Sequence, residues 1–215
     1  MTVPLAQWLG ETVAAAAAFA AAASVMCDAA TAGNLDELRR ALDSGADLNA
    51  LVPRETADGE ECETTALIQA AGAGQLEAAV LLLDRAASPD KPDSFGTTPL
   101  MMAAELGHVA VTGLLAERGA DLHALYNREG GTAFHCACAS NQPGCVEVLV
   151  RAGCNTAAET KDGLTGKQYA EKRGNTEVLD CLRDLVAERL GEAIAGRRHN
   201  GNLLSPSPLS QGATR

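Results

Sequence analysis

The stretch TPLMMAAELGHVAVTGLLAERGADLHA, residues 98–124, contains two short apolar helical patterns, each closed by a glycine. Pro99 suits the first turn of a helix, and Gly107 ends that helix and turns the chain. The second helical pattern places Leu114 on its buried side, and Gly119 ends it. Two helices this short cannot bury their apolar faces alone, so the stretch predicts one unit of a larger stack.

The same pattern recurs along the chain at a spacing of 33 or 34 residues. Copies without gaps start at Thr65, Thr98, Thr132 and Thr165, and a shorter copy lies upstream from Ala29. A period of this length is typical of repeat proteins, in which each unit packs only on its neighbours. The sequence therefore predicts a solenoid of about five repeats.

The pattern TPLMMAAELGH…LLAERGADLHA resembles the ankyrin repeat, over roughly residues 25–190. The resemblance implies an all-α, ankyrin-type solenoid of helix-turn-helix repeats joined by β-hairpin loops. The first unit departs from the pattern because Ser24, Val25 and Met26 stand where the family has Thr-Pro-Leu. The last unit lacks the Pro and His. Terminal repeats are expected to be atypical, because one of their faces meets water.

The expected organisation has three parts: an Ala-rich N-terminal helix over 1–24, a repeat domain over 25–190, and a disordered tail over 191–215. The repeats are placed at about 25–50, 64–96, 97–130, 131–163 and 164–190, with an acidic insertion at 51–63. The tail is rich in Gly, Ser, Pro and Asn and has no helical period. Ser205 and Ser207 each precede a proline, so they are candidate sites for a proline-directed kinase; an unmodified tail is the alternative.

Composition and charge restrict the classes of function. Hydrophobic residues make up 47% of the 215-residue chain and aromatic residues only 3%, so the core must consist mainly of Ala, Leu and Val, which suits packed helices. The net charge is −11, and residues 1–63 alone carry −8. An acidic chain repels phosphate backbones, which argues against nucleic-acid binding. The acidity steers basic partners to the first half, or it only keeps the protein soluble.

An uncharged run of 15 residues, TVAAAAAFAAAASVM, spans residues 12–26. It is too short to cross a bilayer, and no basic residue precedes it, as a secretory signal would require. We therefore expect a helix that packs on the domain of a cytoplasmic protein, with the nucleus as a further compartment. A membrane-targeted protein that uses this run is the alternative.

The seven cysteines form an odd number, which favours a reducing compartment. Four of them crowd into residues 130–155 beside His135, a set of side chains that zinc could use. When the repeat starting at Thr132 is laid on the one starting at Thr98, the four thiols fall on apolar positions: Cys136 on Met102, Cys138 on Ala104, Cys145 on Val111 and Cys154 on Ala120. We expect them to pack in the interior as small hydrophobes. A zinc-dependent or redox-sensing cysteine module is the alternative.

His135 occupies the histidine position of the Thr-Pro-Leu-His motif, and the resemblance implies that its ring hydrogen-bonds the hairpin backbone. The chain's histidines are scattered over different positions of the repeats, and no glycine-rich phosphate loop is present. No catalytic residue, metal ligand or cofactor is predicted, and we do not expect an enzyme. Cys62, on the acidic insertion, is expected to be the first thiol to react with an alkylating reagent.

In the family that the repeats resemble, partners bind mostly across the hairpin tips and the concave helix face. The resemblance therefore implies a non-enzymatic protein-protein interaction module, an adaptor or scaffold, and we expect a monomer. The residues at the corresponding positions are the predicted partner-binding set: Glu61, Thr64, Ser94, Phe95, Thr97, Glu105, Leu106, Arg128, Glu129, Lys161, Asp162, Lys172 and Arg173.

Two features of this surface leave alternatives open. The acidic finger, residues 54–63, carries five carboxylates and one arginine, Arg54. It could dock a basic peptide, hold a cation through its oxygens, or be a solvated loop. Phe95, at a hairpin tip, could anchor a partner or fold back onto a neighbouring loop.

Overall fold

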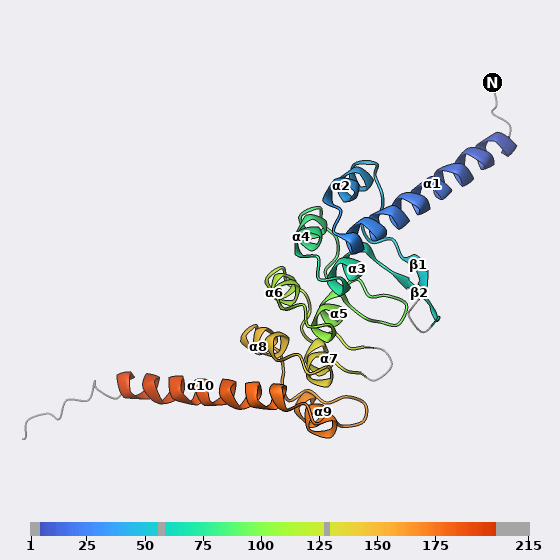
Figure 1. Cartoon of the computed structure of the whole chain (residues 1–215). Helices are drawn as coiled ribbons and strands as arrows, with labels where there is room; N and C mark the ends of the chain where they lie inside the picture. The colour runs from blue at the N-terminus through green and yellow to red at the C-terminus, as the bar shows by residue number, and fades with distance from the viewer. Residues whose placement is uncertain (1–4, 56–58, 127–129, 201–215) are drawn as a thin grey trace, which may run out of the picture.

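The protein folds into a stack of helix pairs, seen in the computed structural model that describes residues 5–55, 59–126 and 130–200 (Figure 1). The helices are α1 (Leu5–Ala32), α2 (Leu35–Asp43), α3 (Ala66–Gly72), α4 (Leu76–Asp84), α5 (Pro99–Glu105), α6 (Val109–Glu117), α7 (Ala133–Ala139), α8 (Pro143–Arg151), α9 (Gly166–Arg173) and α10 (Thr176–Asn200). The strands are β1 (Val52–Glu55) and β2 (Glu61–Thr64).

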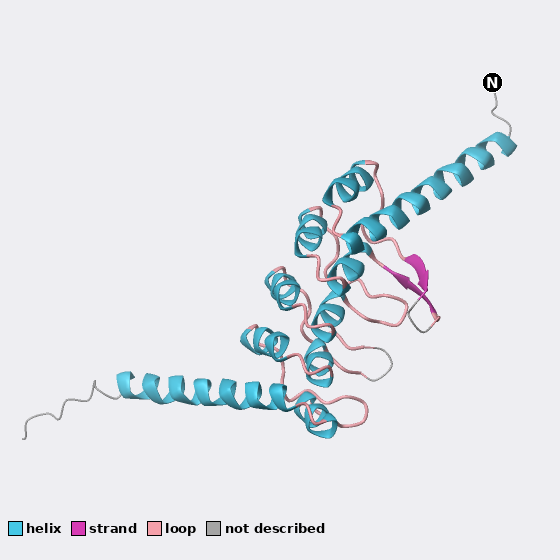
Figure 2. Ribbon diagram, in the orientation of Figure 1, coloured by secondary structure: helices cyan, strands magenta, loops and turns pink. Residues whose placement is uncertain are grey.

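Each repeat adds one helix to each of two rows. The first helices, α1, α3, α5, α7 and α9, contact one another in sequence, and so do α2, α4, α6, α8 and α10 (Figure 1). The predicted solenoid of about five repeats is confirmed. The long connections lie together on one side of the stack (Figure 2), and β1 and β2 pair there antiparallel, from Val52 opposite Thr64 to Glu55 opposite Glu61.

The threonine that opens each first helix from α3 onward explains where that helix begins. The hydroxyls of Thr65 and Thr98 accept the backbone N–H three residues on, each at 3.3 Å. In α9 the Gln168 side chain also returns a bond to the Thr165 backbone N–H, at 2.8 Å. These caps satisfy backbone donors that a helix leaves unpaired at its N-terminus.

Successive repeats contact each other at their turns. A side chain of one repeat packs on the turn glycine of the repeat before it and bonds to that repeat's backbone. Gly74 has φ +67°, and a Cβ there would lie 2.5 Å from Nδ1 of His108. The His108 Nε2 atom in turn contacts the carbonyl of Gly72 at 2.9 Å. The corresponding side chains of other repeats bond the preceding repeat in the same way: Gln75 to the Thr31 carbonyl at 3.2 Å, Gln142 to the Glu105 carbonyl at 3.5 Å and Asn175 to the Ala139 carbonyl at 3.0 Å.

The core runs unbroken through the stack and is built mostly from Ala and Leu. Alanines such as Ala70, Ala103 and Ala137 are fully buried where neighbouring first helices approach each other. The largest fully buried side chains are Phe134, Met26, Leu38, Leu67, Ile68, Leu82, Leu100, Met101, Leu115, Leu149, Val111 and Val146. One aromatic ring among them agrees with the aromatic-poor composition.

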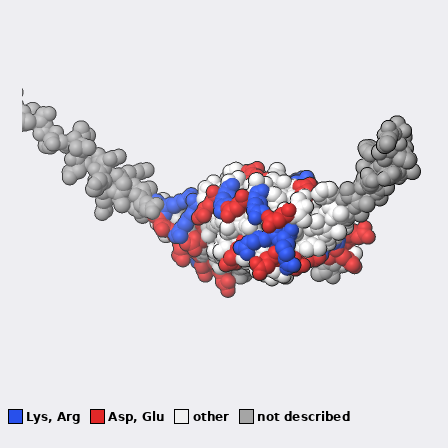
Figure 3. All heavy atoms as spheres, turned by 90° about the horizontal axis from the view of Figure 1, so that it is seen from above, with Lys and Arg blue, Asp and Glu red and all other residues white. Residues whose placement is uncertain are grey.

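Charged side chains of both signs mix on the surface. On the face seen in Figure 3, Lys and Arg side chains lie among Asp and Glu side chains rather than apart from them. Along the second row, Arg85 pairs with Asp43 at 3.1 Å and Arg118 pairs with Asp84 at 2.8 Å. Such exposed pairs contribute about 0–1 kcal/mol each, so the packed core carries most of the stability.

The N-terminal segment continues directly into the first repeat, because α1 runs from Leu5 to Ala32 without a break. Its last turns bury Ala23, Met26 and Cys27 against the stack, while the helix projects beyond the stack at its other end (Figure 1). Among the helices of the described residues, none has the length and apolar character needed to cross a membrane.

The last helix is longer than the sequence predicted. A disordered tail was expected from residue 191, but α10 continues to Asn200. Ala and Glu in GEAIAG, residues 191–196, are good helix formers, and no proline occurs between Pro143 and Pro206. Residues 201–215, with Ser205 and Ser207, lie outside the described residues.

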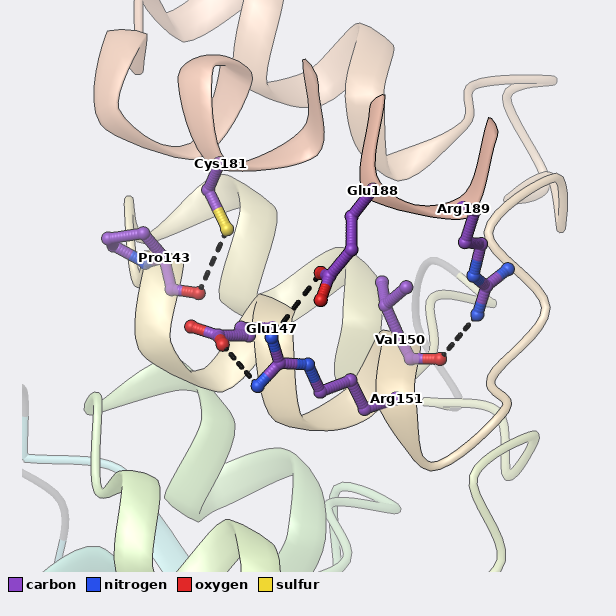
Figure 4. Close-up of polar contacts among 7 residues, drawn as sticks. All are labelled: Pro143, Glu147, Val150, Arg151, Cys181, Glu188 and Arg189. Carbon is purple, nitrogen blue, oxygen red and sulfur yellow. Dashed lines mark hydrogen bonds and ion pairs between the residues drawn. The ribbon is translucent and has the colours of Figure 1, made fainter. Parts of the chain in front are cut away.

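Polar contacts attach α10 to α8 (Figure 4). The Cys181 thiol donates to the Pro143 carbonyl at 3.5 Å. Arg151 of α8 pairs with Glu188 of α10 at 3.4 Å, and a second pair, with Glu147 at 2.6 Å, lies within α8. Arg189 donates to the carbonyl of Val150 at 2.9 Å. The contacts made by Cys181, Glu188 and Arg189 thus connect α10 to α8.

Candidate partner-binding groove

The inner face of the first helices presents one side chain per repeat at the same position. The fifth residues, counted from the capping threonine, are Gln69, Met102, Cys136 and Tyr169. All four are half-buried, which means that each packs on its neighbours and still shows part of its surface. They form a line across α3, α5, α7 and α9.

Two hollows follow this line. The larger, about 290 Å³, lies across α5, α7 and α9, and its wall includes Met101, Tyr126 and His135. The smaller, about 250 Å³, lies across α1, α3 and α5 and includes Gln69. Met102 lines both hollows. We call this surface the inner groove. It extends along the row of first helices, from α1 to α9, and it offers methionine, cysteine and tyrosine side chains to a ligand.

His135 is held rigidly in the wall of the groove. Its Nδ1 accepts the Thr132 backbone N–H at 3.2 Å, so Nε2 carries the proton and donates to the Ala158 carbonyl at 3.1 Å. The expectation that the ring bonds the backbone of the connecting loop is confirmed. Burial lowers the pKa of His135 below its ordinary value, while the bonded carbonyl of Ala158 opposes that shift. The neutral ring is therefore a structural support.

The structure brings several predicted contact residues together in the groove. Thr97, Glu105 and Arg173 line the larger hollow, and Leu106 lines the smaller one. Leu106 is 51% exposed, although it is apolar. Arg173 donates to the Ala139 carbonyl at 3.2 Å, which holds its guanidinium on the inner side of α7.

The connecting loops position the remaining predicted residues. Ser94, in the loop between α4 and α5, bonds to β2: its N–H donates to the Glu63 carbonyl at 2.9 Å and its hydroxyl accepts the Glu63 N–H at 3.0 Å. Phe95 is half-buried, so both interpretations of its role stay open. Exposed side chains elsewhere on the surface are Glu61, Lys161, Asp162 and Lys172. Arg128 and Glu129 lie outside the described residues.

Two predicted contact residues are hardly accessible. Thr64 is 2% exposed and Thr97 is 8% exposed. Each directly precedes a capping threonine, where the chain turns inward to start a helix, and this geometry covers the side chain. Thr64 therefore offers a partner little surface, and Thr97 reaches the surface only in the lining of the larger hollow.

The single arginine of the acidic finger contacts helix α1, and several of the finger's carboxylates are exposed. Arg54 pairs with Asp28 of α1 at 2.6 Å and donates to the Ser24 carbonyl at 3.2 Å. Exposed carboxylates of the finger include Glu55, Glu61 and Glu63. Asp58 lies outside the described residues. The finger therefore presents negative charge beside the N-terminal end of the inner groove.

The cysteines divide into interior and surface thiols. Cys138 and Cys145 are fully buried, as expected, and burial raises the pKa of both. Cys136 was also expected in the interior, but it is half-buried and lines the larger hollow, because its position faces the groove. Burial is also the main cause that raises the pKa of Cys62, which is half-buried on the finger. In the described part of the chain, no three His, Cys, Asp or Glu side chains form a group that could hold a metal ion.

Sequence reasoning did not assign several residues of the groove wall to a binding site, among them Met102, Tyr126, Cys136, Thr160 and Tyr169. A signal was present for three of them. Met102, Cys136 and Tyr169 share one position of the repeat, and that position faces inward in each unit. Tyr126 and Thr160 come from loops, where the helical period gives no direction.

Comparison with known proteins agrees with this architecture. Residues 26–125 match the family model for ankyrin repeats in three copies, and residues 129–161 match the model of the single ankyrin repeat. The human SH3 and multiple ankyrin repeat domains protein 2 is 30% identical over 173 residues, with coverage of 62% of this chain and 9% of that protein.

Two further relatives show the same partial coverage. E3 ubiquitin-protein ligase XBAT33 of Arabidopsis thaliana is 35% identical over 127 residues, with coverage of 58% of this chain and 24% of that protein. The B-cell lymphoma 3 protein homolog of Mus musculus is 32% identical over 146 residues, with coverage of 67% and 30%. The chain thus spans less than a third of each of these three relatives.

Proposed function

The chain belongs to the ankyrin repeat family, and from this premise we propose that it is an adaptor or scaffold that holds a partner protein in the inner groove. Ankyrin repeats mediate protein-protein interaction and are not catalytic modules. The observation that carries the proposal is the pair of hollows that share Met102. A continuous groove on a rigid stack binds with little loss of conformational entropy.

The acidic finger supports a partner with a basic segment. Arg54 pairs with Asp28 outside the finger, and Glu55, Glu61 and Glu63 are exposed, so these carboxylates can attract a cationic segment as it approaches the groove. We propose that the chain acts as a monomer in the cytoplasm and has no chemistry of its own. The ligase activity in the name of the Arabidopsis relative belongs to that protein, of which this chain spans 24%.

Two substitutions in the inner groove and one matched control test the site. Glu105 and Glu117 are both exposed and each ends a helix, but only Glu105 lines a hollow of the inner groove. After affinity purification has identified a partner, isothermal titration should show that Leu106→Ala and Glu105→Ala weaken binding about 5- to 30-fold, as for contacts worth 1–2 kcal/mol. Glu117→Ala should bind like the wild type.

Variants of the acidic finger test the charge preference of the partner independently of the groove variants. The double variant Glu61→Gln, Glu63→Gln should slow association and reduce its salt dependence, because steering by charge acts on the on-rate. If both groove variants bind the partner with wild-type affinity, the inner groove is not the binding site.

A further inference from the structure

The C-terminal end of the stack carries a second hollow surface, separate from the inner groove. It has a volume of about 520 Å³ and lies between α9, α10 and the end of α8. None of its lining residues lines either hollow of the inner groove. We call it the terminal hollow.

The lining of the terminal hollow is mainly apolar. Phe134 and Val150 form its floor and are almost fully buried, while Leu179 and Leu182 of α10 are half-buried. Val186 also lines it, although 58% of that residue is exposed. One turn further along α10, Leu190 is 59% exposed.

These α10 side chains follow the spacing of a helix-helix contact. Leu179, Leu182, Val186 and Leu190 are separated by three, four and four residues, so they lie along one face of the helix. In the preceding repeats, such a face packs on the next unit. At the end of the stack, the described residues include no further unit that could cover it. The geometry therefore fits a helix laid along α10 with one side chain in the hollow.

The charges around the terminal hollow determine the chemistry of that helix. Its lining includes Lys167, Arg183 and Arg189 but only one carboxylate, Glu171. This local excess of positive charge occurs in a chain whose net charge is −11.

The three cations keep capacity to bind a further anion. Lys167 pairs with Glu171 at 3.5 Å, and its side chain stays 65% exposed. Arg183 pairs with Asp180 at 2.5 Å, and its side chain stays 74% exposed. Arg189 donates one bond, to Val150 (Figure 4), while a guanidinium has five N–H donors.

We propose that the terminal hollow binds an acidic amphipathic helix of a partner protein. The partner would place large apolar side chains at helical spacing along α10 and its Asp or Glu residues against Lys167, Arg183 and Arg189. The chain then has two binding surfaces of opposite charge preference: the inner groove with its acidic finger for a basic segment, and the terminal hollow for an acidic one.

A pair of synthetic peptides tests the charge preference. One is a fluorescein-labelled 18-residue helix with Leu at i, i+3, i+4 and i+7 and Glu at the flanking positions, and the other carries Lys in place of Glu. Fluorescence anisotropy with the full-length protein should give at least tenfold tighter binding for the Glu peptide, with affinity that falls as salt is raised. Equal binding of both peptides, or no binding of the Glu peptide at millimolar protein, would overturn the proposal.

Substitutions locate the site. Val186→Asp and Arg183→Glu should each weaken binding of the Glu peptide at least tenfold, with unchanged helical circular dichroism. Leu106→Asp, an equally exposed change in the inner groove, should leave it unchanged, so this result is independent of the function proposed for the groove. If Leu106→Asp abolishes peptide binding and Val186→Asp does not, the peptide occupies the groove and the terminal hollow is not its site.

The chain's own tail is the main competitor for the terminal hollow, because it carries two apolar residues, Leu203 and Leu204, three and four positions after Asn200. The double variant Leu203→Ser, Leu204→Ser in the full chain should bind the Glu peptide with unchanged affinity. An increase in affinity of tenfold or more would show that the tail occupies the hollow in the free protein. This result would contradict the proposal that the hollow serves to bind a partner helix.

Discussion

At the scale of single residues, His135 should make the stability of the fold depend on pH. The folded protein holds the ring neutral between Thr132 and Ala158, and burial lowers its pKa. The unfolded chain takes up a proton near pH 6.5, above the folded value. Between the two pKa values the unfolded state binds more protons, so this contribution to stability is complete above about pH 6.5 and is lost as the pH falls.

The substitution His135→Gln tests this linkage, because Gln168 serves the same capping position in α9. Glutamine can restore the bond to Thr132 but loses the bond to Ala158, so it should cost about 1 kcal/mol at pH 7.5. Urea unfolding should show a smaller difference from the wild type at pH 5, since glutamine does not titrate. The exposed His123→Gln is the control. A difference that stays constant with pH would show that His135 carries no linkage.

The family resemblance implied the role of His135, and the alignment of the repeats predicted the burial of Cys138 and Cys145. It was wrong about Cys136. Cys136 and Met102 share an apolar position, but apolar character does not tell whether a side chain is covered by its neighbours or lines a groove. Only the curvature of the stacked helices decides that, and the curvature arises from packing between units.

At the scale of elements, alanine substitutions at two glycines should have opposite effects on stability, because the two positions differ in their distance from neighbouring side chains. A Cβ at Gly166, the first residue of α9, would lie 2.6 Å from Cε1 of Phe134 and 3.1 Å from Sγ of Cys138. A Cβ at Gly113, inside α6, would find its nearest neighbour, Cγ1 of Val148, at 3.9 Å. The first glycine allows α9 to approach α7, and the second has no such role.

We therefore expect Gly166→Ala to destabilise the protein by about 1–3 kcal/mol through overpacking. Gly113→Ala should stabilise it by about 0.5–1 kcal/mol, because alanine is the better helix former. Thermal unfolding followed by circular dichroism measures both. Similar effects of the two substitutions would mean that close approach at Gly166 does not limit the packing of α9.

Helix starts and turns were predictable because capping threonines and glycines act locally. The C-terminal end of α10 was not predictable. Its extension to Asn200 depends on weak helix propensities, and the composition of this polar segment indicated an irregular structure. The terminal hollow was also beyond sequence reasoning: its walls come from α7, α8, α9 and α10, and it exists because no further described unit follows.

At the scale of the whole molecule, contacts between repeats are sequential, so stability should vary along the stack. The central helices α5, α6 and α7 have neighbours on both sides, while α10 extends beyond the stack (Figure 1). Hydrogen exchange measured by mass spectrometry should be slowest in α5–α7 and fastest near the C-terminal end of α10. Uniform protection along the chain would instead indicate that the stack opens only as a single cooperative unit.

The hydrogen bonds from one repeat to the first-helix carbonyls of the repeat before it recur at equivalent positions along the stack. His108 bonds Gly72, and Gln142 bonds Glu105 at the equivalent place one unit later. Each unit thus offers its successor the same docking surface that it received from its predecessor. A duplicated central unit would find compatible partners at both of its ends. The length of the groove, and with it the length of the segment that it can hold, can therefore change by whole repeats without redesign of any interface.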